Sequence, residues 1–412
     1  MKICDKQLCT GCLACKNVCP RDAISLIENT KGFIYPLIQE SECIHCNRCI
    51  NVCPVNKTIN GFEYRSVYAA LTKNDKVRLE SSSGGIFFCL ARWVINKNGF
   101  VFGAVLCNDM VVRHKEAHTI EELSSLRKSK YVQSEINFSY QKVEKRLKEG
   151  HIVLFSGTPC QIAALRSYLQ MPYSKLFCID VLCHGVPSPG MFKKYIGYEE
   201  SISKSQMTDM LFRSKSIGWK KFKTERFFKN GQKAQWSDSF VPGFLNNYYL
   251  RESCYNCKYA SEYRQGDISL GDYWGYVESK PEYIEDDDKG ISLVIINTEK
   301  GERLFKSIKR EIAYAPRTME NAKQGNAVLY KPCDKPECYE NFWKDAEVLS
   351  WGELKKKYIP EQDTEEWMSK EMRDYFDIPY VKRHRKHKMQ FIFCGIIRKI
   401  KTCFQNIIIM EL

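Results

Sequence analysis

The 412-residue sequence lacks several patterns that identify common classes of protein. Its first residues, MKICDKQLCTGC, contain no apolar stretch that could act as a secretory signal, so we expect a cytoplasmic protein. It has neither a zinc-finger histidine pair nor the aromatic signature of RNA-binding domains, which argues against nucleic acid as a partner despite a formal charge of +14. No Gly-x-Gly-x-x-Gly fingerprint occurs, so a Rossmann dinucleotide fold is disfavoured. The positive charge fits an acidic protein partner better.

The composition is that of an ordinary globular protein, with one exception. Hydrophobic residues make up 44% and charged residues 27%, which is typical of a soluble protein rather than a disordered or membrane-spanning one. The exception is cysteine, of which there are 20. In a reducing cytoplasm, cysteines at tight, fixed spacings are metal ligands more often than disulfides. We therefore expect these thiols to bind metal rather than to form disulfides.

The first segment contains one cysteine motif written twice. The run Cys-x2-Cys-x2-Cys-x3-Cys-Pro occurs at residues 9–20 and again at residues 43–54, and both copies end in Asn-Val-Cys-Pro. In this motif the fourth cysteine of each run crosses to the other cluster. Structural zinc sites use paired Cys-x2-Cys knuckles rather than triplets, which disfavours zinc. The motif predicts a ferredoxin-type domain at residues 1–62 with two 4Fe-4S clusters.

This crossing fixes the predicted ligands of the two clusters. The ligands of the first cluster are Cys9, Cys12, Cys15 and Cys53. Those of the second cluster are Cys43, Cys46, Cys49 and Cys19. Cys4 stands outside the pattern and receives no role. Short strands are expected between the two runs, at residues 23–27 and 33–38.

After residue 62 the sequence alternates between strand and helix patterns. Strands are predicted at residues 67–72, 100–106, 151–155, 176–182 and 291–297, and helices at 84–96, 140–148 and from 160. Residues 207–229 are strand-rich, and the acidic residues 285–288 are expected to form a solvated loop. The predicted fold class is α+β or α/β, with a small ferredoxin-like domain fused to a larger mixed α/β domain.

A second group of cysteines is dispersed over turns. It comprises Cys160, Cys183, Cys254 and Cys257. Cys160 follows a proline where a helix should begin, so the helix dipole and free N–H groups would favour its thiolate form. Spacing alone indicates a metal site, but the Cys254-x2-Cys257 pair could be half of a zinc site and Cys160 a redox thiol. The remaining cysteines match no pattern: Cys89, Cys107 and Cys178 in apolar runs typical of a core, and Cys333, Cys338, Cys394 and Cys403.

Five segments carry a resemblance that joins these features. They are residues 81–85, 155–160, 182–187, 254–257 and 266–274. In this order they resemble motifs of the F-420 hydrogenase/dehydrogenase beta-subunit family, over about residues 63–345. The resemblance implies an FAD-containing protein in which electrons pass between iron–sulfur clusters, flavin and a small molecule such as a deazaflavin coenzyme. A plastid relative instead reduces a chlorophyll precursor.

The resemblance divides the chain after the ferredoxin domain into three parts. Residues 63–150 are expected to form an N-terminal domain with a flavin loop, and residues 151–345 a C-terminal domain with a third cluster and flavin. Residues 346–412 are expected to be a charged helical extension with a basic amphipathic tail. The tail, residues 381–412, suits an interfacial helix at the inner face of a membrane, or a helix docked on the protein or a frayed terminus.

The same resemblance implies roles for individual residues. It makes Cys160, Cys183, Cys254 and Cys257 the ligands of a third 4Fe-4S cluster beside the flavin. Ser82, Ser83, Gly84 and Gly85 precede a helix and could cradle an FAD phosphate, an ordinary serine cap being the alternative. His184 is a candidate proton donor, or only a support for the ligand beside it. Asp180, Asp267 and Asp272 are weaker candidates that could simply cap loops.

Two classes of function follow from the sequence. The first is an iron–sulfur flavoprotein oxidoreductase that exchanges electrons with a ferredoxin, a flavodoxin or a partner oxidoreductase and acts on a small-molecule substrate. The second is an electron-transfer subunit or accessory protein that feeds a partner enzyme. The basic tail alone raises surface polysaccharide or lipid modification as the setting for such an accessory protein.

Overall fold

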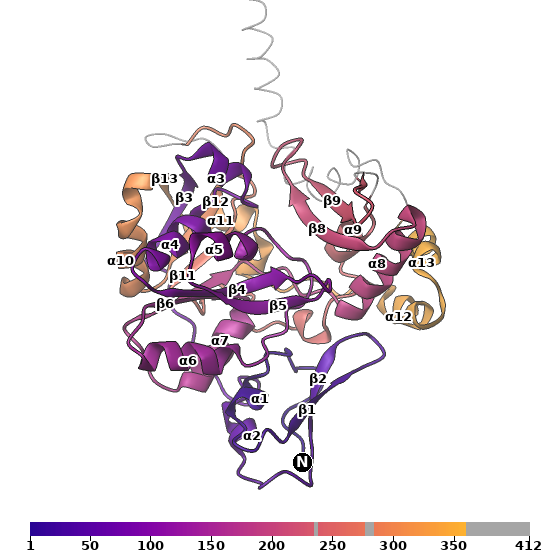
Figure 1. The fold of residues 1–412 in the computed structure, drawn as a ribbon. Coiled ribbons are helices and arrows are strands. Elements are labelled where there is room, and N and C mark those ends of the chain that lie inside the picture. Colours follow the sequence, from indigo (N-terminus) through magenta and orange to yellow (C-terminus); the bar gives the residue numbers. More distant parts are fainter. Residues whose placement is uncertain (235–237, 277–283, 360–412) are drawn as a thin grey trace, which may run out of the picture. The chain divides into compact units, whose positions relative to one another are not determined.

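A mixed sheet of eight strands organises the larger part of this computed structural model, which describes residues 1–234, 238–276 and 284–359 (Figure 1). In sheet order the strands are β13 (Ile312–Arg317), β3 (Ser66–Thr72), β12 (Ser292–Ile296), β11 (Ile268–Asp272), β7 (Leu176–Val181), β6 (Val153–Gly157), β4 (Phe100–Leu106) and β5 (Val112–Ala117). The neighbours β11, β7, β6 and β4 are parallel, and antiparallel strands extend the sheet on both sides. The predicted mixed α/β architecture is confirmed.

Helices cover both faces of this sheet, which explains its apolar central strands. Every residue of β12 is buried, as expected for a strand between two layers. One face packs on α4 (Ile86–Ile95), α5 (Ile120–Leu126) and α10 (Glu299–Ser307). The other face, around β4, β6 and β7, packs on α6 (Ser139–Lys148) and α7 (Pro159–Leu169). The elements predicted in this region all occur, and their ends differ by two residues or fewer.

The start of α7 positions one predicted ligand. Thr158 and Gln161 form a reciprocal capping box, and Pro159 occupies the first turn, where its missing N–H is no loss. Cys160 therefore follows directly after β6. Because β6 and β7 are parallel neighbours, their carboxyl ends meet at one edge of the sheet, where Cys183 also follows its strand.

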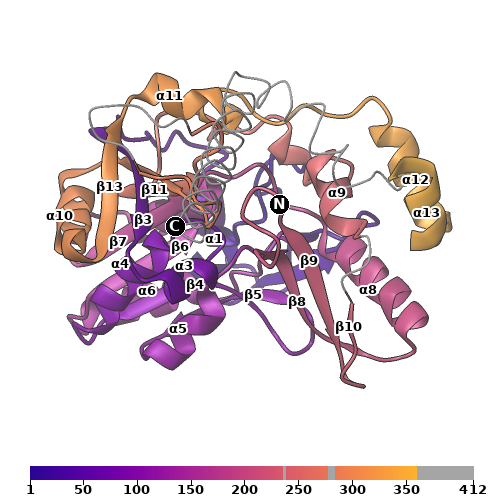
Figure 2. The ribbon, with the colours of Figure 1, turned by 90° about the horizontal axis from the view of Figure 1, so that it is seen from above.

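A second, smaller sheet belongs to an aromatic core. It contains β8 (Met207–Ser214), β9 (Lys223–Phe228) and β10 (Lys233–Ala234), all antiparallel, in the region predicted to be strand-rich. Around this core lie α8 (Pro189–Ser203), α9 (Phe240–Leu245), α12 (Tyr339–Val348) and α13 (Trp351–Tyr358), and Figure 2 shows α8 beside the strands. Trp351 anchors the packing, because its buried indole donates to Ser239 Oγ at 2.9 Å.

The remaining elements are short. They are α3 (Asp75–Leu79), α11 (Met319–Gln324) and single 3-10 turns at Glu252–Cys254, Lys309–Glu311 and Ala327–Leu329.

The ferredoxin module, residues 1–62, repeats its structure as well as its sequence. The helices α1 (Ala14–Val18) and α2 (Arg48–Val52) each follow a cysteine loop, and β1 (Ile24–Glu28) pairs with β2 (Ile34–Ile38) between the loops. Figure 1 shows α1 and α2 next to the layer of α6 and α7, with which they are in contact. Module and sheet belong to one compact unit, Met1–Glu361.

Two predictions for the C-terminal half are not confirmed. Residues 285–288 form a loop, but the prediction of a simply solvated loop is wrong, since Asp287 pairs with the buried Arg78 at 2.6 Å and Asp286 with Lys220. A buried guanidinium needs such a counter-ion.

The tail at 381–412, and all of the extension beyond residue 359, lie outside the described residues. Within the described ranges, no helix combines the length and apolar character needed to cross a membrane.

Asp180, at 0% exposure in β7, offers a test of this framework. It accepts hydrogen bonds from Gln265 N at 2.8 Å and Gly266 N at 3.0 Å and pairs with Arg264 at 3.3 Å. Asp180→Ala would leave a buried guanidinium unpaired, so we expect the free energy of unfolding to fall by about 3–5 kcal/mol in anaerobic urea denaturation.

The matched control is Asp109→Ala, which removes a carboxylate that is 54% exposed and pairs with Arg113. An exposed pair of this kind contributes about 1 kcal/mol or less. Equal destabilisation by both substitutions would contradict the structural role given to Asp180.

Candidate functional site: three cysteine sets

The two cysteine loops of the ferredoxin module share a backbone that suits an anion. Gly11 and Leu13 in the first loop have φ values of 66° and 56°, and His45 and Asn47 in the second loop have 52° and 57°. Such left-handed residues turn neighbouring N–H groups into one concavity, as in many phosphate and iron–sulfur sites. Leucine rarely adopts this conformation, so Leu13 in particular is held in it by its surroundings. The shared loop conformation therefore follows from the site rather than from local preference.

The first predicted ligand set lies around one cavity. This cavity, about 330 Å³ with its mouth included, is lined by Cys4, Cys9, Cys12, Cys15 and Cys53. A hydrogen bond from Cys4 lowers the pKa of the Cys9 thiol to about 6, against the opposing effect of burial. Sequence reasoning missed Cys4, because it belongs to no spacing motif and reaches the cavity only through the fold.

The second predicted set lines another cavity, nearer the surface. Its volume is about 340 Å³, and Cys19, Cys43, Cys46 and Cys49 are among its lining residues. Cys46 is exposed, whereas Cys12, Cys15 and Cys53 of the first set are buried. Each cavity thus receives three cysteines from one run and the fourth from the other run, in the predicted crossed arrangement.

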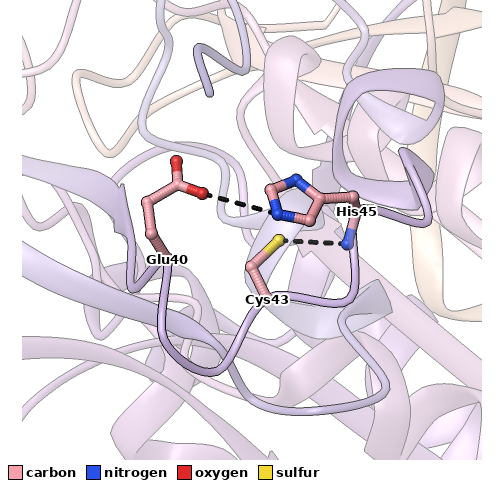
Figure 3. A group of neighbouring side chains, drawn as sticks. All are labelled: Glu40, Cys43 and His45. Atoms are coloured by element: carbon pink, nitrogen blue, oxygen red, sulfur yellow. Dashed lines mark hydrogen bonds and ion pairs between the residues drawn. The ribbon is translucent and has the colours of Figure 1, made fainter.

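A smaller group of ligand atoms overlaps the second set. Glu40, Cys43 and His45 each have one within 4.8 Å of the others (Figure 3). The His45 N–H donates to Cys43 Sγ at 3.4 Å, and the imidazole Nε2 lies 3.9 Å from Glu40 Oε2. A separate ion here would compete with the cluster for the same thiolate. The N–H bond to sulfur instead suits Cys43 as a cluster ligand.

The fold also brings together the third predicted set, Cys160, Cys183, Cys254 and Cys257. They come from the start of α7, the end of β7, and the 3-10 turn at Glu252–Cys254 with the residues after it. Burial raises the pKa of Cys183 well above its usual value, and the charges of the other three thiols raise it further. All four are free thiols. Four converging thiols without a disulfide fit a metal cluster.

Burial outweighs the helix start at Cys160. It raises the pKa of this thiol to about 12, with Cys257 adding to the effect, although a hydrogen bond with Thr158 at 3.1 Å lowers it. The expectation that the helix start would favour the thiolate is therefore wrong for the metal-free chain. A bound metal ion would itself deprotonate the thiol.

The unassigned cysteines divide into core residues and one neighbour of the third set. Cys89 and Cys178 are buried in the core, as predicted, and Cys107 is half-buried. Cys333 Sγ donates to Cys254 O at 3.8 Å, a contact that no sequence signal could have revealed. Cys338 is half-buried, and Cys394 and Cys403 lie outside the described residues.

Arg251 lies at the junction between the first and third sets. Its guanidinium, at 0% exposure, donates to Cys9 O at 2.7 Å, Cys9 Sγ at 3.7 Å and Gln133 Oε1 at 2.9 Å. Among the residues that the structure describes, no carboxylate forms an ion pair with it, and it lies over the rings of Tyr35 and Phe33, 4.2 Å and 5.3 Å from their centroids. Its charge also lowers the pKa of Cys160 and Cys254, against the larger effect of burial. A buried cation requires a negative partner, and thiolates of an iron–sulfur cluster fit that requirement.

The predicted flavin loop forms a tight turn before α4. Hydrogen bonds hold it to neighbouring segments, among them those from Ser129 N to Ser82 Oγ (2.8 Å), from Ser83 Oγ to Ile291 O (2.8 Å) and from Gly84 N to Ser292 Oγ (2.9 Å). The alternative of an ordinary serine cap is wrong, because Gly85 is the N-cap, with φ of 84° and no capping side chain. Lys215 Nζ lies under the loop and donates to Ser83 O at 2.6 Å.

His184 is held by contacts with Asn247 and Phe244. Asn247 Nδ2 donates to Asp334 O at 3.0 Å, so Asn247 Oδ1 is left to accept from His184 Nε2 at 2.6 Å. The edge-on ring of Phe244, with its centroid 5.2 Å away, completes the packing. These contacts fix the orientation of the residue beside Cys183, while a role as proton donor stays a prediction.

The three aspartates of the sequence analysis occupy structural positions. Asp180 binds the backbone of residues 265 and 266, as described above. Asp267 accepts from Cys178 N at 2.8 Å and Thr298 Oγ1 at 2.7 Å. Asp272 accepts from Trp219 Nε1 at 2.7 Å and pairs with Arg213. These contacts agree with the alternative role given to the three aspartates, which was to cap loops.

Comparison with known proteins addresses the same regions. Residues 150–321 match the family model for the C terminus of the coenzyme F420 hydrogenase/dehydrogenase beta subunit, and residues 8–57 match the 4Fe-4S dicluster domain. A coenzyme F420-dependent sulfite reductase of Methanocaldococcus jannaschii is 25% identical over 316 residues, which are 75% of this chain and 47% of the relative. The chain thus spans about half the length of that relative.

Two further proteins are similar to parts of the chain. An uncharacterised polyferredoxin-like protein of Methanocaldococcus jannaschii is 35% identical over 63 residues, 13% of this chain and 38% of the relative. A chain of the F420-reducing nickel–iron hydrogenase complex from Methanosarcina barkeri is 18% identical, with a TM-score of 0.43 over 72% of this chain and 92% of that chain.

Arg251→Met tests the electrostatic role of the buried guanidinium. Reduction adds negative charge to a cluster, so loss of this cation and its N–H···S bond should make the reduction potential of the first cluster more negative. Anaerobic redox titration followed by electron paramagnetic resonance measures the shift. Arg251→Lys, which retains the charge, should give a smaller change.

The second cluster is the internal control, because none of its predicted ligands contacts Arg251. Its potential should stay the same in both variants. An equal shift of the two clusters, or none, would count against the assigned role.

Proposed function

We propose that the chain is an iron–sulfur flavoprotein oxidoreductase of the coenzyme F420 hydrogenase/dehydrogenase beta-subunit family, because residues 150–321 match the model for the C terminus of that subunit and residues 8–57 match a 4Fe-4S dicluster domain. It exchanges electrons with a carrier such as ferredoxin or flavodoxin and acts on a small organic molecule. One observation carries the proposal: the third cysteine set converges beside the ferredoxin module, with the unpaired cation of Arg251 between that set and Cys9.

The arrangement of the three sets supports electron transfer between the surface and the larger domain. The second set includes the exposed Cys46, three of the four cysteines of the first set are buried, and the four cysteines of the third set are half-buried. A carrier protein would meet the exposed end. A single structural metal site would not require three neighbouring sets of cysteines.

The residues of the flavin loop fit a phosphate group of FAD. Gly84 approaches β3 so closely that a Cβ there would overlap Ala70 O, so only glycine allows the turn to pack in this position. The turn opens a helix of 10 residues, whose N-terminal N–H groups favour an anion. Lys215 holds the turn from within the protein, because its Nζ donates to the carbonyl oxygens of Arg78, Ser83 and Lys289. When bound, a flavin would collect single electrons and pass them on as a pair.

The first candidate for the substrate comes from the name of a relative rather than from a recognised pocket. The sulfite reductase relative is named for its dependence on coenzyme F420. A deazaflavin is therefore the first candidate for the small molecule that exchanges an electron pair with the flavin. Another organic molecule of similar redox chemistry is the alternative.

A second function has one observation in its favour. The match covers only 47% of the sulfite reductase, so a reaction that needs the other part of that relative would require a partner. In this case the chain would be an electron-transfer subunit or accessory protein. A stable partner on co-purification, with no turnover by the isolated chain, would favour it.

Anaerobic purification with iron, sulfide, zinc and flavin analysis tests the main proposal. We expect about twelve irons and one FAD per chain, from three cubane clusters and a single flavin. Cys257→Ser should lower the iron content by about four and leave the two ferredoxin clusters visible in the spectrum. Cys89→Ser, a change in the apolar core, is the control and should retain all the iron.

About eight irons without flavin would refute the third cluster and the flavin together, and would leave a two-cluster electron carrier. Eight irons together with zinc would instead support the alternative that the Cys254-x2-Cys257 pair belongs to a structural zinc site.

Gly84→Ala tests the flavin loop separately. The added methyl group would displace the turn from β3, so we expect less flavin per chain at unchanged iron content, measured by absorbance after release of the cofactor. Gly197→Ala is the matched control, since no atom lies within 4 Å of the added Cβ. If both variants retain flavin equally, the loop does not hold it.

A further inference from the structure

Tyr259 has a buried hydroxyl group without a hydrogen-bond partner. The residue is 5% exposed, and its Oη contacts no donor or acceptor among the residues that the structure describes. Leaving such a group unsatisfied destabilises the folded protein. A buried polar atom of this kind calls for an explanation, and a bound ligand is a common one.

The position of Tyr259 in the chain points to that ligand. It follows the third-set ligand Cys257 by two residues, in a turn closed by the bond from Ala260 N to Cys257 O at 3.2 Å. The residue between them, Lys258, donates through Nζ to Pro54 O and to Lys57 O. Pro54 directly follows Cys53, a predicted ligand of the first cluster. The turn that carries Tyr259 therefore bridges the two cysteine sets.

The electrostatic surroundings of the phenol agree with this position. Burial raises the pKa of Tyr259 above its usual value, and the charges of Cys160, Cys12, Cys257 and Cys53 raise it further. Two of these thiols belong to the first set and two to the third. A phenol hydroxyl can donate a hydrogen bond to an anionic sulfur, and the electrostatic effect of these four thiols indicates that sulfurs of both sets lie near it.

We propose that the Tyr259 hydroxyl donates a hydrogen bond to a sulfur of an iron–sulfur cluster at the junction between the first and third sets, and so raises the reduction potential of that cluster. The sulfur is a cysteine thiolate or an inorganic sulfide. Hydrogen bonds to cluster sulfurs are among the factors that set these potentials, because they stabilise the more negative, reduced form. The inference rests on the proposed function for the third cluster, and on the dicluster domain alone for the first.

Tyr140 provides a matched comparison. Its side chain is at 0% exposure, and after burial the charges of Cys12, Cys160 and Cys15 raise its pKa. Its hydroxyl, however, already donates to Gln161 O at 3.2 Å. Both tyrosines are buried and both are affected by Cys12 and Cys160, but only the Tyr259 hydroxyl lacks a hydrogen-bond partner among the described residues.

The experiment compares Tyr259→Phe and Tyr140→Phe in the full chain, purified without oxygen and titrated potentiometrically with electron paramagnetic resonance detection. Iron and sulfide analysis of the unsubstituted chain first establishes how many clusters are present. We expect Tyr259→Phe to make the potential of one cluster more negative, by up to about tenfold in its reduction constant, or ~59 mV for a one-electron couple. The cluster that shifts identifies the acceptor, and Tyr140→Phe should leave all potentials unchanged.

Three results would overturn the proposal. The first is unchanged potentials in Tyr259→Phe at full iron content. The second is an equal shift in both variants, which would reflect general polarity rather than a hydrogen bond. The third is loss of a cluster in Tyr259→Phe, which would assign the hydroxyl to assembly instead of tuning. If the unsubstituted chain holds only two clusters, the proposed third cluster fails, and the potential of the first cluster still decides the role of Tyr259.

Discussion

The buried guanidinium of Arg251 is the interaction on which the arrangement of the cysteine sets depends. It binds the backbone and the sulfur of Cys9 in the ferredoxin module and is held by Gln133 of the larger domain. Gln133 in turn donates to Thr10 O, so the first cysteine loop is fixed from both sides. A charge placed in such a setting is stable only when an anion balances it. The junction is thus both a packing contact and an electrostatic match for a cluster.

Desolvation dominates the chemistry of the third cysteine set. Burial raises the pKa of Cys160 and of Cys254 to about 12, and it also raises that of Cys183. Without a metal these thiols would be protonated and of little use as nucleophiles. The raised pKa argues against a redox-thiol role for Cys160 in the metal-free chain, whereas a bound metal ion would deprotonate the same thiol.

Much of the fold could be predicted from the sequence, because its strands and helices have clear apolar patterns. The strand at 100–106 has the predicted ends, and the capping residues around Pro159 fix the start of α7. The ferredoxin ligands follow from a duplicated motif. What the sequence could not reveal depends on long-range packing: Cys4 and Cys333 match no spacing, and the serines of the flavin loop bind neighbouring segments rather than cap the helix.

The exposed second cysteine set has a consequence for the handling and lifetime of the protein. Its sequence nearly repeats that of the first set, yet Cys46 lies open to solvent while the corresponding Cys12 is buried. Oxidation of cysteine ligands follows their exposure. The two cysteine sets of the duplicated module would therefore be oxidised by air at different rates. The exposed second set would be oxidised first. A sample that has lost its outer cluster could still keep its inner one, so partial activity loss in air would have a defined structural origin.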